Sequence, residues 1–133
     1  MTGVLPRPLY EPESAASGSI VALSVSKCAT CGRHEFPYRD RCPSCRSDSV
    51  PALLSTRAHV VGFTSVSHSP PGALVDVPYV VATAAFPEGL SVLGRVVGVG
   101  LDELAIGDAV DTVAAEVGDG THYAYRLAIE ADR

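Results

Sequence analysis

Four cysteines in two pairs constrain this chain more than any other feature of its sequence. They fall as Cys28-Ala29-Thr30-Cys31 and Cys42-Pro43-Ser44-Cys45, with ten residues between the pairs. A C-x2-C step lets two thiolates reach one ion from a tight turn whose backbone N–H groups point at the sulfurs. Gly32 can adopt the positive φ that such a turn often requires, and Pro43 fixes φ in the second turn. The spacing therefore predicts one metal site built from Cys28, Cys31, Cys42 and Cys45.

The predicted site is structural, and zinc is its expected metal, with one ion per chain. Four cysteine ligands close a tetrahedral shell and leave no open coordination position. Iron is the alternative, because rubredoxin-type sites use the same spacing. His34 lies between the pairs, but with four cysteines available we interpret it as a solvated hairpin residue rather than a ligand.

We expect a cytoplasmic protein with no membrane segment. No apolar run approaches the roughly 20 residues that a membrane helix needs. The first eight residues lack the charged-then-apolar pattern of a signal peptide. Cysteines in a cytosolic chain are more often metal ligands than disulfides, which agrees with the predicted site.

Charge is unevenly distributed along the 133 residues, whose net charge is −5. Residues 27–57 carry six basic and three acidic side chains, whereas residues 58–133 carry three basic and ten acidic ones. The basic stretch can offset the −2 charge of four thiolates around a divalent ion. The acidic stretch repels a phosphate backbone, which counts against general nucleic-acid binding.

From His59 onward the sequence is typical of an all-β domain. A helical turn is expected at residues 101–106, and Gly94 and Gly98 suggest bulges or bends in the third strand. Breaks are expected at Pro70-Pro71-Gly72 and at Gly118-Asp119-Gly120. Five short strands with a helical turn between the third and fourth fit a small, partly open barrel of the OB type. The expected strands are residues 60–67, 79–86, 90–99, 109–117 and 122–129, which are rich in valine.

The chain divides into three expected parts. Residues 1–18 are rich in proline, serine and alanine, which favours an extended or poorly ordered arm. Residues 19–50 are interpreted as the zinc ribbon, which opens on a strand at residues 19–27 with Val21, Leu23 and Val25 on one face. Residues 51–133 are interpreted as the barrel. The expected fold class is mostly β, with an N-terminal ribbon followed by a five-stranded barrel.

Several stretches of the chain resemble one known family. In the ribbon these stretches are Lys27-Cys28-Ala29-Thr30-Cys31-Gly32, Phe36-Pro37 and Cys42-Pro43-Ser44-Cys45. In the barrel they are Gly62-Phe63-Thr64-Ser65-Val66, Pro70-Pro71-Gly72, Val77-Pro78-Tyr79-Val80-Val81-Ala82, Leu93-Gly94-Arg95-Val96-Val97-Gly98 and Ile106-Gly107-Asp108-Ala109-Val110. Together they resemble the zinc-ribbon/OB-fold acyl-CoA-associated proteins, in which a rubredoxin-like zinc ribbon precedes an OB-fold barrel. The resemblance covers nearly the whole chain.

The resemblance implies a non-catalytic accessory or scaffold subunit. Such proteins accompany thiolase-type enzymes, ketoacyl synthases or enoyl-CoA hydratases as hetero-oligomers, and they assist acyl-CoA access. Many members begin with a longer amphipathic helix, whereas the arm here is broken by prolines. We expect no catalytic residue, because no serine or cysteine nucleophile sits in a recognisable motif beside His59, His68 or His122.

Arginines and aromatic residues of the ribbon are the remaining candidates for function. Phe36 and Tyr38 would stack bases in a single-stranded nucleic-acid-binding OB protein, or they cap the small ribbon core, which we favour. The arginines either contact CoA phosphates or balance the charge of the metal site. After the accessory subunit and the nucleic-acid-binding protein, the third hypothesis is a rubredoxin-like electron carrier. It needs iron and leaves the barrel without a role. The candidate CoA contacts are Arg39, Arg41, Arg46 and Arg57.

Overall fold

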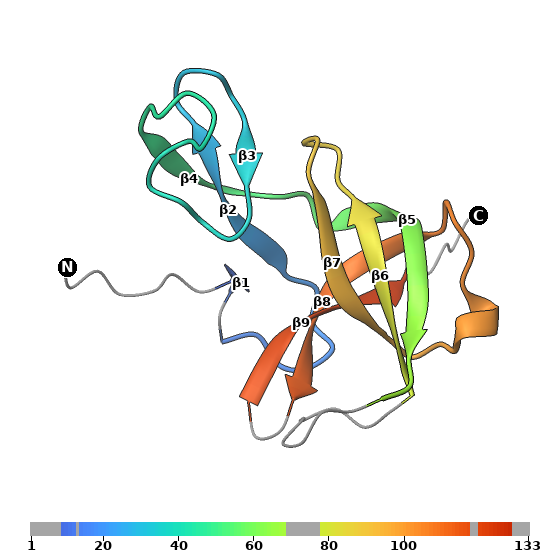
Figure 1. Ribbon diagram of the computed structural model, residues 1–133. Coiled ribbons are helices and arrows are strands. Elements are labelled where there is room, and N and C mark those ends of the chain that lie inside the picture. The colour runs from blue at the N-terminus through green and yellow to red at the C-terminus, as the bar shows by residue number, and fades with distance from the viewer. Residues whose placement is uncertain (1–8, 13, 69–77, 118–119, 129–133) are drawn as a thin grey trace.

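Two β structures packed against each other make up the chain (Figure 1). The computed structural model describes residues 9–12, 14–68, 78–117 and 120–128. A four-stranded sheet, here called the ribbon sheet, carries the cysteines, and a closed barrel of five strands follows it. The described residues contain almost no helix, so the expected mostly-β class is confirmed.

The ribbon sheet is organised around one long strand. β2 (Ala22–Cys28) pairs antiparallel with β1 (Tyr10–Glu11), with β3 (His34–Glu35) and with β4 (Ser49–Leu53). Side chains alternate along a strand, so every second residue reaches the core. The predicted inward face is confirmed, because Val21, Leu23 and Val25 are all buried.

The barrel strands follow one another in the order β5-β6-β7-β9-β8, which is closed by the pairing of β5 with β8. All neighbouring strands are antiparallel except β7 and β9, which run parallel. A short 3-10 helix, η1 (Leu101–Glu103), lies between β7 and β8, within the expected helical turn. The predicted five-stranded OB barrel is therefore confirmed, although it is closed rather than partly open. Its strands are β5 (Arg57–Val66), β6 (Tyr79–Ala85), β7 (Ser91–Val97), β8 (Ala109–Val117) and β9 (Gly120–Leu127).

The glycines of the third barrel strand do not form bulges. The β6–β7 ladder runs without a shift from Val80 to Ala85, and the register shift lies in β5, between Val60 and Gly62. A Cβ on Gly94 would lie 2.8 Å from the ring of Tyr125. Gly94 is therefore needed for close packing rather than for a bend. Gly98 lies in a bend just beyond β7 with a φ of +85°, so the expected bend is confirmed at this glycine.

Ribbon sheet and barrel share one hydrophobic core. Leu23 and Val25 of β2 belong to the same buried cluster as Val60 and Tyr125 of the barrel. Backbone hydrogen bonds also cross the junction, because the Val21 N–H donates to the Thr112 carbonyl at 2.9 Å and the Ala114 N–H donates to the Ser19 carbonyl at 2.9 Å. The two parts consequently stabilise each other.

The described portion of the arm lies against the folded core. Tyr10 pairs with Leu23 in the ribbon sheet, is 6% exposed, and its hydroxyl is hydrogen-bonded to the hydroxyl of Thr121 at 2.7 Å. The Gly18 N–H donates to the Ala114 carbonyl at 2.7 Å. This part of the arm thus contacts both the ribbon sheet, through Tyr10, and the barrel, through Gly18. The expected breaks at Pro70-Pro71-Gly72 and at residues 118–119 lie outside the described residues.

Candidate metal centre and its surroundings

The two cysteine turns have the same local geometry. In the first, the Gly32 N–H donates to the Cys28 carbonyl at 3.1 Å, and in the second the Arg46 N–H donates to the Cys42 carbonyl at 2.9 Å. Both donors lie in the left-handed region, with φ of +78° for Gly32 and +66° for Arg46. The positive φ expected at Gly32 is confirmed. The sequence does not reveal its counterpart, because arginine rarely adopts this conformation.

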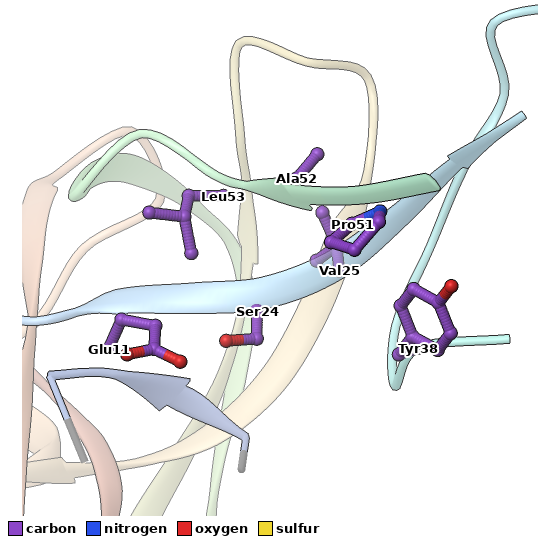
Figure 2. A pocket seen from close by; sticks show the side chains of 7 residues that line it. All are labelled: Glu11, Ser24, Val25, Tyr38, Pro51, Ala52 and Leu53. Atoms are coloured by element: carbon purple, nitrogen blue, oxygen red, sulfur yellow. The ribbon is translucent and has the colours of Figure 1, made fainter. Parts of the chain in front are cut away.

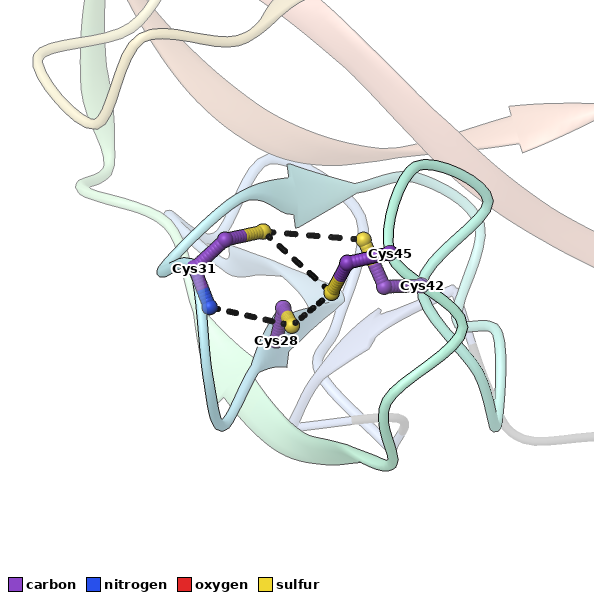
Figure 3. A group of neighbouring side chains, drawn as sticks. All are labelled: Cys28, Cys31, Cys42 and Cys45. Atoms are coloured by element: carbon purple, nitrogen blue, oxygen red, sulfur yellow. Dashed lines mark hydrogen bonds between the residues drawn. The ribbon is translucent and has the colours of Figure 1, made fainter.

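All four sulfurs meet at one point (Figure 3). Every Sγ lies within 4.8 Å of the others, and Sγ–Sγ distances are 3.4 Å for Cys28 and Cys45, 3.7 Å for Cys31 and Cys42, and 3.8 Å for Cys31 and Cys45. A tetrahedral zinc with bonds of about 2.3 Å requires sulfurs about 3.8 Å apart. A disulfide would need about 2.0 Å. The cluster therefore has the size and the donor set of a tetrahedral metal site.

Backbone donors of the turns point at the sulfurs. The N–H groups of Thr30 and Cys31 donate to the Cys28 sulfur at 3.4 and 3.3 Å, and the Ser44 N–H donates to the Cys42 sulfur at 3.4 Å. The hydrogen bond from Cys31 lowers the pKa of Cys28. Hydrogen bonds from the hydroxyl and the N–H of Ser47 lower the pKa of Cys45 to about 6. Such donors stabilise thiolates, which are the metal-binding form of cysteine. At Cys31 the hydrogen bond from the Arg33 N–H lowers the pKa, but hydrogen bonding with the Cys28 sulfur and burial outweigh it and raise that pKa to about 11.

The candidate arginines fall into two places. Arg41 donates from Nη1 to the Arg46 carbonyl at 3.0 Å, so these two lie together on the second cysteine turn. Arg39 is exposed in the segment between β3 and that turn, and its backbone N–H donates to the Ser26 hydroxyl at 3.2 Å. Arg57 belongs to β5 of the barrel, where its Nε lies 3.1 Å from a carboxylate oxygen of Asp111. The structure thus gives Arg57 an acidic partner within the chain.

The two aromatic residues of the ribbon have different surroundings. The ring of Phe36 meets the ring of Tyr123 edge-to-face, with centroids 5.7 Å apart, so it joins the ribbon to β9 of the barrel. The hydroxyl of Tyr38 donates to the Ser49 carbonyl at 3.5 Å. Phe36 therefore packs at the junction rather than only within the ribbon, a contact that no local pattern predicts.

A small pocket on the ribbon sheet lies apart from the sulfurs (Figure 2). It has a volume of about 180 Å³ and lies between β1, β2 and β4, with Tyr38 at one end. Among the described residues that line it, no nucleophile is paired with a base. The lining consists of Glu11, Ser24, Val25, Tyr38, Pro51, Ala52 and Leu53.

Histidines take no part in the sulfur cluster. His34 is half-buried in β3, and the group of close metal-ligating side chains in the described chain contains only the four cysteines. His59 and His68 are exposed, and His122 stacks on Tyr123 with ring centroids 4.6 Å apart.

Of the helical segments in the described chain, none has the length and apolar character that crossing a bilayer requires.

A four-cysteine ribbon that shares its core with a five-stranded OB barrel is the architecture of the ribbon/OB-fold proteins. The family model described as "ChsH2, C-terminal OB-fold domain" matches residues 52–115. A "DUF35 domain-containing scaffold protein" of Methanothermobacter thermautotrophicus is 35% identical over 97 residues, which cover 71% of this chain and 73% of that protein. The chain belongs to the DUF35 family.

Two further relatives carry more specific descriptions. A "probable enoyl-CoA hydratase alpha subunit" of Thermomonospora curvata is 31% identical over 85 residues, which cover 64% of this chain but only 27% of that protein. Among solved structures, the one described as "Ltp2-ChsH2(DUF35) aldolase" superposes with a TM-score of 0.69 at 28% identity. That alignment covers 81% of this chain and 86% of the other chain.

Proposed function

We propose that this chain is a non-catalytic accessory or scaffold subunit of an acyl-CoA-processing enzyme of the thiolase-like, ketoacyl synthase-like or enoyl-CoA hydratase-like kind. The observation that carries the proposal is membership of a family whose relatives include scaffold proteins and a probable enoyl-CoA hydratase subunit. The fold likeness to a chain of the Ltp2-ChsH2(DUF35) aldolase supports it. A metal site with four cysteine ligands has no open position for a substrate, which also favours a structural role.

One zinc ion per chain is the proposed cofactor. Its ligands would be Cys28, Cys31, Cys42 and Cys45, whose sulfurs have the spacing that a tetrahedral ion needs. When bound, the ion would cross-link the two cysteine turns and stabilise the ribbon. The N–H groups that point at the Cys28 and Cys42 sulfurs support ligation by thiolates. We place the protein in the cytoplasm, where thiols stay reduced.

The proposed acyl-CoA contacts are the arginines of the ribbon. Arg39, Arg41 and Arg46 are exposed, and a CoA that reaches the partner's active site beside the ribbon would meet their positive charge. Arg57 comes next, because it lies 3.1 Å from the largely buried Asp111, whereas the pair of Arg41 with Asp48 is longer, at 4.0 Å, and exposed. The division into residues 1–18, 19–50 and 51–133 also remains our proposal. β4, Ser49–Leu53, extends across the limit between the last two parts.

Co-purification tests the proposed function. The chain is expressed together with the thiolase-type or hydratase-type enzyme encoded beside it, and size-exclusion chromatography measures the complex. We expect a hetero-oligomer, and no acyl-CoA turnover by the chain alone. Robust activity of the rigorously purified chain, or no complex with any such enzyme, would overturn the proposal. Tight, salt-sensitive binding of single-stranded RNA would favour the nucleic-acid reading, and bound iron with visible absorbance would favour the electron carrier.

A further inference from the structure

A shallow apolar groove lies at the surface of the barrel, between β6, β7, the last residue of β8 and the start of β9, with a volume of about 340 Å³. β6 and β7 pair beside the groove, whereas β7 and β9 pair only at Val96–Tyr125 and Val97–Arg126, beyond the residues of either strand that line it. Leu93, in the middle of β7, is 58% exposed there. The side chains that form the groove are chiefly Tyr79, Val81, Leu93, Arg95, Val117 and Tyr123.

One wall of the groove is preformed. Gly94 has no Cβ, and a Cβ there would lie 2.9 Å from the ring of Tyr123, so glycine lets this ring lie directly on β7. The Tyr123 hydroxyl donates to the Leu93 carbonyl at 2.6 Å, which satisfies the polar end of the side chain. The ring therefore presents apolar surface in one fixed position. Rigid aromatic surface of this kind costs little conformational entropy when a partner covers it.

One positive charge at the groove has no acidic partner among the described residues. Arg95 donates from Nη2 to the Glu116 backbone carbonyl at 3.3 Å, and the ion pairs found in the described chain do not include it. None of the residues that line the groove is acidic. A guanidinium beside apolar surface is stabilised most by a carboxylate, which it can bind with two parallel hydrogen bonds.

We propose that this groove docks the catalytic partner subunit, which covers Leu93 with an apolar side chain and places a carboxylate against Arg95. The proposal rests on the proposed function and assigns the surface through which it operates. Tyrosine and arginine around an apolar centre are the composition that interface cores favour. Because Tyr123 also contacts Phe36, the ribbon adjoins one wall of the groove, and one partner can cover both.

Other occupants fit the groove less well. A second copy of the chain in a two-fold dimer would bring another Arg95 and no lining carboxylate to meet it. A nucleic acid would bring phosphates to a segment, residues 58–133, that carries ten acidic and three basic side chains. A protein segment with an acidic residue beside an apolar one would pair with the charge of Arg95 and cover the apolar surface at Leu93.

A matched pair of substitutions tests the docking surface. Leu93→Glu places a charge in the groove, whereas Ile106→Glu does so at a residue that is 63% exposed and does not line it. Binding of each full-length variant to the separately purified catalytic subunit encoded beside it is measured by calorimetry. We expect Leu93→Glu and Arg95→Glu to raise Kd by about 10- to 100-fold, and Ile106→Glu to leave it within about twofold of the unchanged chain.

The outcomes separate the docking surface from the proposed function. If the unchanged chain binds and the groove variants bind equally well, this surface is wrong and the accessory role stands. If the unchanged chain binds no such enzyme, both proposals fall. A homodimer in sedimentation that Leu93→Glu dissociates would assign the groove to a second copy instead. Circular dichroism checks the fold of each variant. Hydrogen exchange of the unchanged complex gives an independent readout. We expect the partner to increase the protection of β7 and β9, and unchanged protection of these strands would count against the groove.

Discussion

Single residues explain how the ribbon turns form and where they are vulnerable. Gly32 and Arg46 occupy equivalent positions, four residues after the first cysteine of each pair, and both have positive φ. Glycine adopts this conformation at little cost, whereas arginine carries strain there. The second turn is therefore the less favourable of the two, and metal ligation is the interaction expected to hold it.

Loss of one ligand should release the metal. We expect Cys42→Ser to lose zinc and to unfold residues 27–48, because ligand binding supplies much of the folding free energy in such small modules. Elemental analysis measures zinc, and hydrogen exchange reports on the segment. The control is Ser44→Ala in the same turn, whose backbone N–H still donates to Cys42. Retention of a full equivalent of zinc by Cys42→Ser would contradict the proposed site.

Of the barrel glycines in the described part of the chain, Gly94 is the most closely packed. An alanine there would place Cβ 2.8 Å from the ring of Tyr125, which is fully buried and held by a hydrogen bond to the Val92 carbonyl. We expect Gly94→Ala to lower the free energy of unfolding by about 1–3 kcal/mol, as other overpacked cores do. Gly62→Ala is the control, because a Cβ there meets open space. Equal denaturation midpoints for the two variants would refute this packing role.

At the scale of elements, β2 connects the metal site to the barrel. Its last residue, Cys28, is a proposed ligand, and Leu23 and Val25 enter the shared core. Phe36, which follows β3, adds a second connection through Tyr123 of β9. The position of the ribbon on the barrel thus depends on contacts from two separate segments, β2 and the residue after β3.

The aromatic contact should contribute measurable coupling. In a double-mutant cycle with Phe36→Leu and Tyr123→Leu, we expect a coupling free energy of about 0.5–1.5 kcal/mol, which is the usual value for edge-to-face rings. Denaturant unfolding of the metal-loaded protein measures it. Strictly additive single substitutions would show that the ring contact adds nothing beyond the burial of each side chain.

At the scale of the whole molecule, a basic ribbon lies on an acidic barrel. Residues 27–57 carry an excess of three positive charges and residues 58–133 an excess of seven negative ones. With such a separation, the ribbon attracts anionic ligands and the barrel repels them. The groove between β6, β7 and β9 is apolar and is available for contact with a protein.

Neutralising the ribbon should affect substrate use and leave assembly intact. We expect the triple variant Arg39→Ala, Arg41→Ala, Arg46→Ala to raise the KM of the assembled complex for acyl-CoA, with a smaller effect at high salt because ions screen exposed charges. The matching Arg→Lys triple variant keeps the positive charge, so its complex should have a KM for acyl-CoA close to that of the unchanged complex. Unchanged acyl-CoA kinetics in the alanine triple would remove these arginines from the proposal.

The sequence by itself determined the features that depend on near neighbours. The C-x2-C spacing places two sulfurs on one turn, so the four-cysteine cluster could be predicted before any contact between strands was known. Strand positions followed from runs of β-branched residues, and β8 was predicted at the bounds it has in the structure, residues 109–117. The alternation of Val21, Leu23 and Val25 likewise showed which face of β2 is buried.

The tertiary structure decided what depends on residues far apart in the chain. Closure of the barrel through β5 and β8, the contact of Phe36 with Tyr123, and the pairing of Arg57 with Asp111 join segments that no local period relates. Gly94 was expected to form a bulge or bend, because a strand glycine permits either that or close approach of another group. Only packing of Tyr123 and Tyr125 from β9 against β7 selects the second role, and the same packing forms the groove.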